Sequence, residues 1–469
     1  MSASKQTKAR AAAQERSPDP VAQDPVAQDP AKALLSRRVP AFGGGTRVPG
    51  DKSISHRALI LGALAVGETT IEGLLESADV MATLAALERL GVDIEHADGL
   101  WRVFGAGVGG LGEAARALDL GNSGTGVRLL MGVAAQHPFT TFFTGDPSLC
   151  ARPMARVIEP LEGMGASVVA RSGGRLPLAL RGPERLLPVS HRLAVPSAQV
   201  KSAILLAGLN APGETSVIEA TPTRDHTELM LRHFGALVGV EAVEGETRIT
   251  LEGEAELKPQ AVAVPGDVSS AAFPLAAALL VPDGDLTLEN VGLNPRRSGL
   301  IETLGEMGAA IEVQNARSVG GEAVADLRVR SSALSGVEVP PERAPRMIDE
   351  YPVLAVLAAC ARGPTAMRGL AELRVKESDR LRAIAEGLSA CGVALELAGD
   401  DLIVEGAGHP PKGGVTIESR FDHRIAMAFL TLGLVADEPV GVDDGSMIET
   451  SFPEFIELMN RLGADIGEG

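Results

Sequence analysis

The stretch VPGDKSISHRALILGALAVGETTIEGL, from Val48 to Leu74, carries the pattern that decides the fold. A polar start is followed by an apolar run of small residues, a Gly-Glu turn and a run rich in β-branched residues. This order predicts a buried helix, a turn and a strand. Five later stretches are counterparts of it, and most of them contain the helix, the turn and the strand: GTGVRLLMGVAA, SAQVKSAILLAGLNAPGETSVIEA, VSSAAFPLAAALLVPDGDLTLENV, DEYPVLAVLAACARGPTAMRGL and DHRIAMAFLTLGLVADEPVGVDD.

A second pattern recurs with the first. Six times, apolar helix positions precede a glycine and then a short strand, which is typical of a glycine at the C′ position, where the chain turns with positive φ. One unit therefore holds two helices and several strands, and a unit of about 70 residues is a supersecondary module. We expect two domains of three units each. The six glycines are Gly91, Gly165, Gly235, Gly308, Gly392 and Gly463.

Composition and charge exclude several classes of function. The chain has 469 residues, and only 3% are aromatic, so we expect no nucleic-acid recognition by base stacking. The net charge of −18 argues against nucleic acid and anionic membranes as partners. The three cysteines form no C-x-x-C pair, which predicts neither a disulfide framework nor a zinc site and fits a cytoplasmic protein.

Residues 1–38 differ from the rest of the chain. The stretch DPVAQDPVAQDP is rich in proline and aspartate and has no apolar run of signal-peptide length. Such a composition cannot bury enough apolar surface to order itself, so we expect a disordered tail.

The six small-residue helices are polar only at their N-terminal ends. Serine, aspartate and asparagine are good N-caps, worth about 1 kcal/mol each, and capping is a sufficient interpretation for Asp267, Ser269 and Ser270. It does not explain the cations, because a helix N-terminus already carries about +0.5 charge. Either neighbouring protein carboxylates pair with these cations or a bound anion does. The groups that exceed the needs of a cap are Lys52, Arg57, Gln199, His423 and Arg424.

Several related helices with this property favour a bound anion. If the helix ends of both domains face the cleft between them, they converge on one small anionic ligand, and without it the like charges repel. Arg152, Arg224 and Arg380 add charge, and Pro153 predicts a loop at Arg152. The stretch KESDR, which begins at Lys376, has a plain alternative as a solvated helix start with i,i+4 pairs. The glycine-rich stretch GAGVGG occupies the turn after a strand in its unit, so we do not expect a dinucleotide site there.

Eight stretches in order resemble the 5-enolpyruvylshikimate-3-phosphate synthase family. Their residues resemble its second bacterial class more than its enterobacterial class. The resemblance runs from about Val39 to the C-terminus. It implies an α/β fold of two domains, each with three βαβαββ units around buried parallel helices, and an active site in the interdomain cleft. The expected domains are residues 39–50 with 265–469, and residues 51–264. The stretches are PGDKSISHRALIL, GNSGTGVRLL, ARPMARV, SAQVKSAILLAGL, TRDHTELML, MIDEYPVLA, RVKESDRL and DHRIAMAF.

The resemblance also implies a reaction: transfer of the enolpyruvyl group of phosphoenolpyruvate to the 5-hydroxyl of shikimate 3-phosphate, through a tetrahedral intermediate. This is a step of the shikimate pathway, inhibited by glyphosate at the phosphoenolpyruvate site. No metal or organic cofactor is implied, and we expect a monomer. The implied catalytic residues are Asp349, Glu377 and Lys52, with Asp349 as the base near the hydroxyl and Glu377 as the carboxyl that protonates carbon. Shikimate 3-phosphate is expected to meet Lys52, Ser53, Arg57, Ser197, Ala198, Gln199, Arg224, Asp349 and Lys376. Phosphoenolpyruvate is expected to meet Lys52, Gly124, Arg152, Gln199, Arg380 and Arg424.

Two alternatives stay open. A sister enzyme of the same fold transfers enolpyruvyl to a UDP-sugar, and it usually carries a reactive cysteine on a mobile loop. Cys150 lies two residues before Arg152, although we interpret it as a packing residue. The other alternative is a non-catalytic scaffold that binds phosphorylated metabolites, against which the full set of charged residues argues.

Overall fold

The computed structural model describes residues 32–469, and most of the expected tail lies outside the described residues. The tail was predicted to reach residue 38, which is wrong at its end. Residues Leu34–Arg37 form strand β1, which pairs with β23 (Glu438–Val442) on one side and with β24 (Asp465–Glu468) on the other. Leu34 is buried in a hydrophobic core, so this short strand is fixed by packing and by pairing on both edges.

Two separate hydrophobic cores organise the described residues. One gathers side chains from Ile54 to Val264, and the other gathers side chains from Leu34 to Val48 and from Val268 to Ile466. We call residues 51–264 the N lobe, and residues 32–50 with 265–469 the C lobe.

Each lobe contains three four-stranded sheets of one pattern, in which a parallel pair is followed by two antiparallel pairs. The strands are given in their order across each sheet. The first N-lobe sheet contains β14 (Ala261–Ala263), β3 (Val66–Glu72), β5 (Leu100–Ala106) and β4 (Asp93–Ala97), and the second contains β6 (Leu118–Asp119), β7 (Thr140–Thr144), β9 (Arg175–Arg181) and β8 (Ser167–Arg171). The third contains β10 (Ser190–Arg192), β11 (Glu214–Glu219), β13 (Glu246–Glu252) and β12 (Val238–Val243). The C-lobe sheets are β2 (Gly43–Arg47), β15 (Asp285–Gly292), β17 (Glu322–Arg330), β16 (Ala310–Val319); β18 (Glu338–Val339), β19 (Arg362–Met367), β21 (Asp401–Ala407), β20 (Ala394–Ala398); and β22 (Gly413–Ile417), β23, β1, β24.

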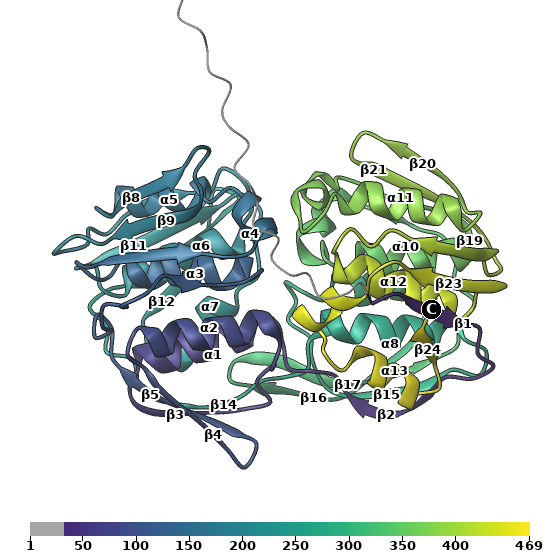
Figure 1. Ribbon diagram of the computed structural model, residues 1–469, viewed down its shortest axis with the longest axis horizontal. Coiled ribbons are helices and arrows are strands. Elements are labelled where there is room, and N and C mark those ends of the chain that lie inside the picture. The colour runs from purple at the N-terminus through teal and green to yellow at the C-terminus, as the bar shows by residue number, and fades with distance from the viewer. Residues whose placement is uncertain (1–31) are drawn as a thin grey trace, which may run out of the picture. The chain divides into compact units, whose positions relative to one another are not determined.

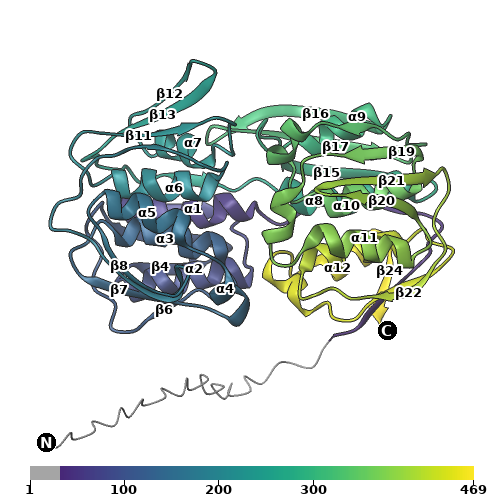
Figure 2. The ribbon, with the colours of Figure 1, turned by 90° about the horizontal axis from the view of Figure 1, so that it is seen from above.

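The small-residue helices lie inside these sheets and pack against one another (Figures 1 and 2). Almost every residue after their first turn is buried, because the sheets surround them on most sides. In the N lobe they are α1 (Lys52–Leu64), α3 (Gly124–Ala134) and α6 (Ala198–Gly208), and in the C lobe α8 (Val268–Leu280), α10 (Tyr351–Cys360) and α12 (His423–Gly433).

The second helix of each unit ends as the sequence predicts. All six C′ glycines have positive φ, between 86° and 109°. These helices are α2 (Ala78–Arg89), α5 (Ala155–Gly163), α7 (His226–His233), α9 (Gly299–Glu306), α11 (Arg380–Ala390) and α13 (Phe455–Arg461). The remaining helical segments are α4 (Pro147–Ala151) and the 3₁₀ turns η1 (Pro341–Arg346), η2 (Ala371–Val375) and η3 (Ser446–Thr450).

The chain passes between the lobes twice, and the two passages pair with each other. Gly50 and Gly266 form an antiparallel bridge. The Asp51 amide donates to the Pro265 carbonyl over 2.8 Å, and the Asp267 amide donates to the Pro49 carbonyl over 2.9 Å. The starts of α1 and α8 are therefore held side by side. Within residues 32–469, no helix is long and apolar enough to cross a membrane.

Candidate active site between the lobes

Helix α1 brings two of the predicted cations to the interlobe region. Asp51 caps the helix by accepting from the Ile54 amide over 2.9 Å, which places Lys52 and Ser53 in its first turn. The Lys52 ammonium pairs with the carboxylate of Asp79 on α2. For this cation, a protein carboxylate is the partner that the structure provides.

Arg57 has a different environment, because its partners in the described chain are neutral. Its guanidinium donates to Thr227 Oγ1 over 2.7 Å, to Ser202 Oγ over 2.7 Å and to the Ser53 carbonyl over 2.9 Å. The side chain is buried, and burial lowers the pKa of Arg57 to about 10, with Glu228 and Asp51 partly opposing that effect. The group is thus charged at neutral pH and is met only by dipoles within hydrogen-bond distance.

Helix α3 contributes a second, half-buried arginine, which contacts a side chain of α6. Arg128 donates to the Gly124 carbonyl over 3.0 Å and to Gln199 Oε1 over 2.7 Å, while Gln199 Nε2 donates to Thr125 Oγ1 over 2.9 Å. Burial and the neighbouring charge of Arg152 lower the pKa of Arg128 to about 10. Ser197 caps α6 at the Val200 amide, which makes Ala198 and Gln199 the first residues of that helix.

On the C lobe, Arg380 organises the predicted carboxylates. Its side chain is 1% exposed and contacts Asp422 over 2.8 Å, Asp349 over 3.1 Å and Glu377. Lys376 Nζ lies 3.2 Å from Asp349 Oδ1. Arg424 Nη1 donates to the Asp349 carbonyl over 3.1 Å and lies 3.7 Å from Glu350 Oε1.

Two of these carboxylates also receive arginines from the N lobe. Arg224 pairs with Asp349, and Arg152 Nη1 lies 3.9 Å from Glu377 Oε1. Arg152 ends α4 in an extended conformation, as Pro153 requires. The expected repulsion between the lobes is therefore corrected: Asp349 and Glu377 lie between cations of both lobes, and the contact is attractive.

Comparison of this chain with known proteins identifies its family. The family model described as EPSP synthase (3-phosphoshikimate 1-carboxyvinyltransferase) matches residues 39–459. The chain belongs to the EPSP synthase family. A relative from Paramagnetospirillum magneticum, named 3-phosphoshikimate 1-carboxyvinyltransferase, is 62% identical over 438 residues, which cover 93% of this chain and 98% of the relative. A relative of the same name from Rhodospirillum rubrum is 60% identical over 441 residues, 93% of this chain and 98% of the relative.

Solved structures confirm the predicted two-domain enolpyruvyl transferase fold. The EPSP synthase from Acinetobacter baumannii matches with a TM-score of 0.83 at 43% identity, covering 93% of this chain and all of that one. The enolpyruvyl transferase NikO from Streptomyces tendae matches with a TM-score of 0.72 at 20% identity, over 94% of this chain and 99% of that one, which shows the fold alone.

The electrostatics of the site set the charge of its two central carboxylates. Burial would raise the pKa of Asp349, but Lys376, Arg224, Arg424 and Arg380 together hold it well below its usual range. Burial likewise opposes ionisation of Glu377, yet Arg380 and Arg152 hold its pKa well below the usual range. Both carboxylates are ionised at neutral pH in this arrangement. Glu377 therefore carries no proton that it could donate while Arg380 and Arg152 remain paired with it.

Every residue expected in the site lies at the interlobe ends of these helices or in the segments beside them. Arg128 was missed, although the sequence held a signal for it: an arginine one turn into an otherwise apolar buried helix needs a polar partner. Arg57 shows the same feature on α1.

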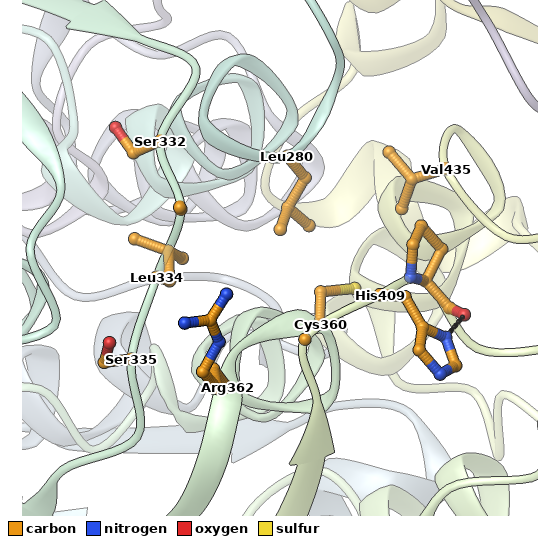
Figure 3. A pocket seen from close by; sticks show the side chains of 11 residues that line it. Leu280, Ser332, Leu334, Ser335, Cys360, Arg362, His409 and Val435 are labelled. Atoms are coloured by element: carbon orange, nitrogen blue, oxygen red, sulfur yellow. Dashed lines mark hydrogen bonds between the residues drawn. The ribbon is translucent and has the colours of Figure 1, made fainter.

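One cavity in the described part of the chain lies away from this site. It has a volume of 220 Å³ and is lined by Leu280 and Cys360, the last residues of α8 and α10, and by Val435 just beyond α12 (Figure 3). It therefore adjoins the C-terminal ends of the C-lobe helices, whereas the charged residues gather at the N-terminal ends. Burial raises the pKa of Cys360 to about 12, so this thiol is not a reactive thiolate.

Proposed function

We propose that the interlobe site transfers the enolpyruvyl group of phosphoenolpyruvate to the 5-hydroxyl of shikimate 3-phosphate and releases phosphate. The family match and the name that its relatives carry, 3-phosphoshikimate 1-carboxyvinyltransferase, support this reaction. The chain is accordingly an enzyme of the shikimate pathway, which leads to the aromatic amino acids. A monomeric, cytoplasmic protein stays a prediction.

The observation that carries the proposal is the environment of Arg57 and Arg128. Arg57 is buried and Arg128 is half-buried. A guanidinium that is largely withdrawn from water and has only neutral hydrogen-bond partners is costly, and an anion that reaches it recovers much of that cost. Two such groups lie on adjacent inner helices of one lobe, which suits a pair of substrates that each bear a phosphate and a carboxylate. We assign Arg57, with Ser197, Ala198 and Gln199, to shikimate 3-phosphate, and Arg128, with Arg152 and Gly124, to phosphoenolpyruvate.

The proposed chemistry starts from ionised Asp349. The Asp349 carboxylate accepts the proton of the 5-hydroxyl as the hydroxyl oxygen bonds to C2 of phosphoenolpyruvate, while C3 gains a proton. Elimination then breaks the bond from C2 to the phosphate oxygen, re-forms the double bond between C2 and C3, and returns a C3 proton to the enzyme. The leaving phosphate takes the hydroxyl proton from Asp349, which restores the carboxylate. In our assignment Glu377 carries that proton. It acquires it once substrate anions draw Arg152 and Arg380 away, because its pKa rises when those two charges are engaged elsewhere. Lys52, paired with Asp79, contributes positive charge beside both substrates.

The rival acceptor, a UDP-sugar, is disfavoured by the relatives' shared name. Cys150, which kept it open, is half-buried against the N-lobe core, and its thiol donates to the Gly145 carbonyl over 3.3 Å. The non-catalytic scaffold is excluded if the chain turns over substrate.

The experiment is a phosphate-release assay with phosphoenolpyruvate and either shikimate 3-phosphate or UDP-N-acetylglucosamine. We expect release with shikimate 3-phosphate only; release with the sugar nucleotide alone, or with neither acceptor, refutes the proposal. Arg57→Met should raise KM for shikimate 3-phosphate, and Arg128→Met should raise KM for phosphoenolpyruvate, each by about ten- to a hundredfold, since a hydrogen bond to a charged group contributes about 1.5–3 kcal/mol. Arg102→Met, at an exposed arginine paired with Glu68 on the N-lobe surface, is the control.

A further inference from the structure

The loop between β15 and α9, residues 293–298, contacts both passages of the chain between the lobes. Within it, Arg297 is 3% exposed. Its Nη1 donates to Asp51 Oδ2 over 3.2 Å, and its Nη2 donates to Asp267 Oδ1 over 3.2 Å. Asp51 and Asp267 are the N-caps of α1 and α8, the first inner helix of each lobe. One guanidinium thus holds the starts of both helices.

The same loop makes a second contact across the lobes through Asn294. Its side-chain amide donates to Asp225 Oδ1 over 2.7 Å, at the start of α7 in the N lobe. It also donates over 2.9 Å to Glu322 of the C lobe, which lies 2.6 Å from His226 Nδ1. Asp225 directly follows Arg224, the N-lobe arginine that pairs with Asp349.

Arg297 connects to the candidate site in both directions. Toward the N lobe, its partner Asp51 fixes the first turn of α1, which carries Lys52 and Ser53. Toward the C lobe, Arg297 Nη2 donates to Ser269 Oγ over 2.5 Å, and Ser269 donates in turn to Glu350. Glu350 follows Asp349 in the chain and lies beside Arg424.

We propose that Arg297, supported by Asn294, is a positioning residue that sets the angle between the lobes and thereby aligns Lys52 with Asp349 and Arg424. The inference rests on the proposed function, because it assumes that groups of both lobes act on one substrate pair. A buried arginine between two carboxylates is also what keeps those carboxylates from repelling each other, so the angle depends on its two separate contacts. Lysine carries a single point charge and cannot reproduce the two separate contacts that the planar guanidinium makes with Asp51 and Asp267.

The test compares Arg297→Met, Arg297→Lys and Asn294→Ala with a matched control, Arg343→Met. Arg343 is another nearly buried C-lobe arginine, held by Glu306 over 2.6 Å and Glu302 over 3.2 Å, and it contacts neither passage. We expect Arg297→Met to lower kcat by about ten- to a hundredfold at saturating substrates, because small misplacements of catalytic groups have effects of that size. Arg297→Lys should recover part of this loss, and Asn294→Ala should show a smaller loss even if Arg297→Met fails to fold.

Small-angle scattering supplies a readout that does not require turnover. We expect a larger radius of gyration for Arg297→Met than for wild type or Arg343→Met, with every protein measured below its melting temperature. If the Arg297 variants lower the melting temperature as Arg343→Met does but keep wild-type kcat and scattering, Arg297 is only structural and the inference is overturned. A wild type that releases no phosphate would instead refute the proposed function, while the scattering comparison would still decide the lobe angle.

Discussion

Gly124→Ala adds one methyl group at the position that we assign to phosphoenolpyruvate. A Cβ at this position would lie 2.9 Å from Arg128 Nη1 and 2.9 Å from Arg152 Nη1. These atoms are the ends of flexible side chains, so the methyl group fits once both guanidinium groups move by several tenths of an ångström. Alanine also removes the entropic cost of glycine in a helix, about 0.5–1 kcal/mol, so we expect no loss of stability.

The displaced arginines should distinguish two ligands of different length. Glyphosate is longer than phosphoenolpyruvate, so we expect it to need the space along Gly124 more. We therefore expect Gly124→Ala to raise the inhibition constant of glyphosate at least about tenfold, roughly 1.4 kcal/mol, with a smaller rise in KM for phosphoenolpyruvate. We expect wild type, with glycine here, to retain room for the inhibitor.

The assay measures phosphate release at saturating shikimate 3-phosphate, giving both constants for wild type and variant. Gly163→Ala is the control, because that glycine ends α5 in the same lobe and a Cβ there meets nothing within 4 Å. Equal losses for inhibitor and substrate would refute the reasoning, since the methyl group would then act without regard to ligand length.

The other predictions concern the chain terminus, a buried charge and the two central carboxylates. Deleting residues 1–31 should leave activity and melting temperature unchanged, whereas deleting residues 1–38 removes β1 and should lower the melting temperature by several degrees in calorimetry. Lys201→Met should destabilise the N lobe by about 3–5 kcal/mol in urea unfolding, because Lys201 is the buried partner of both Glu219 and Glu228; a change below 1 kcal/mol would contradict this. Asp349 has a lowered pKa in the folded state, so its stabilising contribution is present above about pH 4 and is lost as the pH falls through the folded-state pKa. Wild type should therefore lose more stability than Asp349→Asn below pH 4. Equal losses of stability in the two proteins would contradict this prediction. Binding of shikimate 3-phosphate with phosphoenolpyruvate should take up a proton at Glu377, seen as a buffer-dependent heat in calorimetry that is absent from Glu377→Gln.

The repeat architecture was predictable because its signals are local. A few residues around a glycine such as Gly91 or Gly463 are enough to predict each helix end, and the six copies of the pattern support the same prediction. Strand β1 was not predictable in the same way. Its four residues carry little periodicity, and its partners lie some 400 residues later: Leu34 pairs with Val442 and Glu468. The first passage between the lobes, near Gly50, came from the family resemblance alone.

In the candidate site, residue types were predictable and partners were not. An excess of cations at helix starts can be read from the sequence, but which carboxylate each cation meets depends on tertiary packing. Arg380 contacts Glu377 at the local i,i+3 spacing, but it also contacts Asp349 and Asp422 from separate segments, and no spacing rule links those two to it. Arg128 escaped notice because it lies inside an apolar run whose neighbours all suit a buried helix.

These partners change the interpretation of closure. Arg152 and Arg224 of the N lobe already contact Glu377 and Asp349 of the C lobe, so bound anions do not simply relieve repulsion. They compete with two protein carboxylates for the same guanidinium groups. Each arginine that turns to substrate leaves a carboxylate with less positive charge around it, and a less stabilised carboxylate is a stronger base. Under the proposed function, substrate binding therefore shifts Glu377, which Arg380 and Arg152 hold ionised, toward the protonated form that its role needs. Asp349, whose pKa is lowered by four surrounding cations, stays ionised and ready to accept the hydroxyl proton. In this proposal, the cations that the substrates remove decide which carboxylate acts as the acid and which as the base.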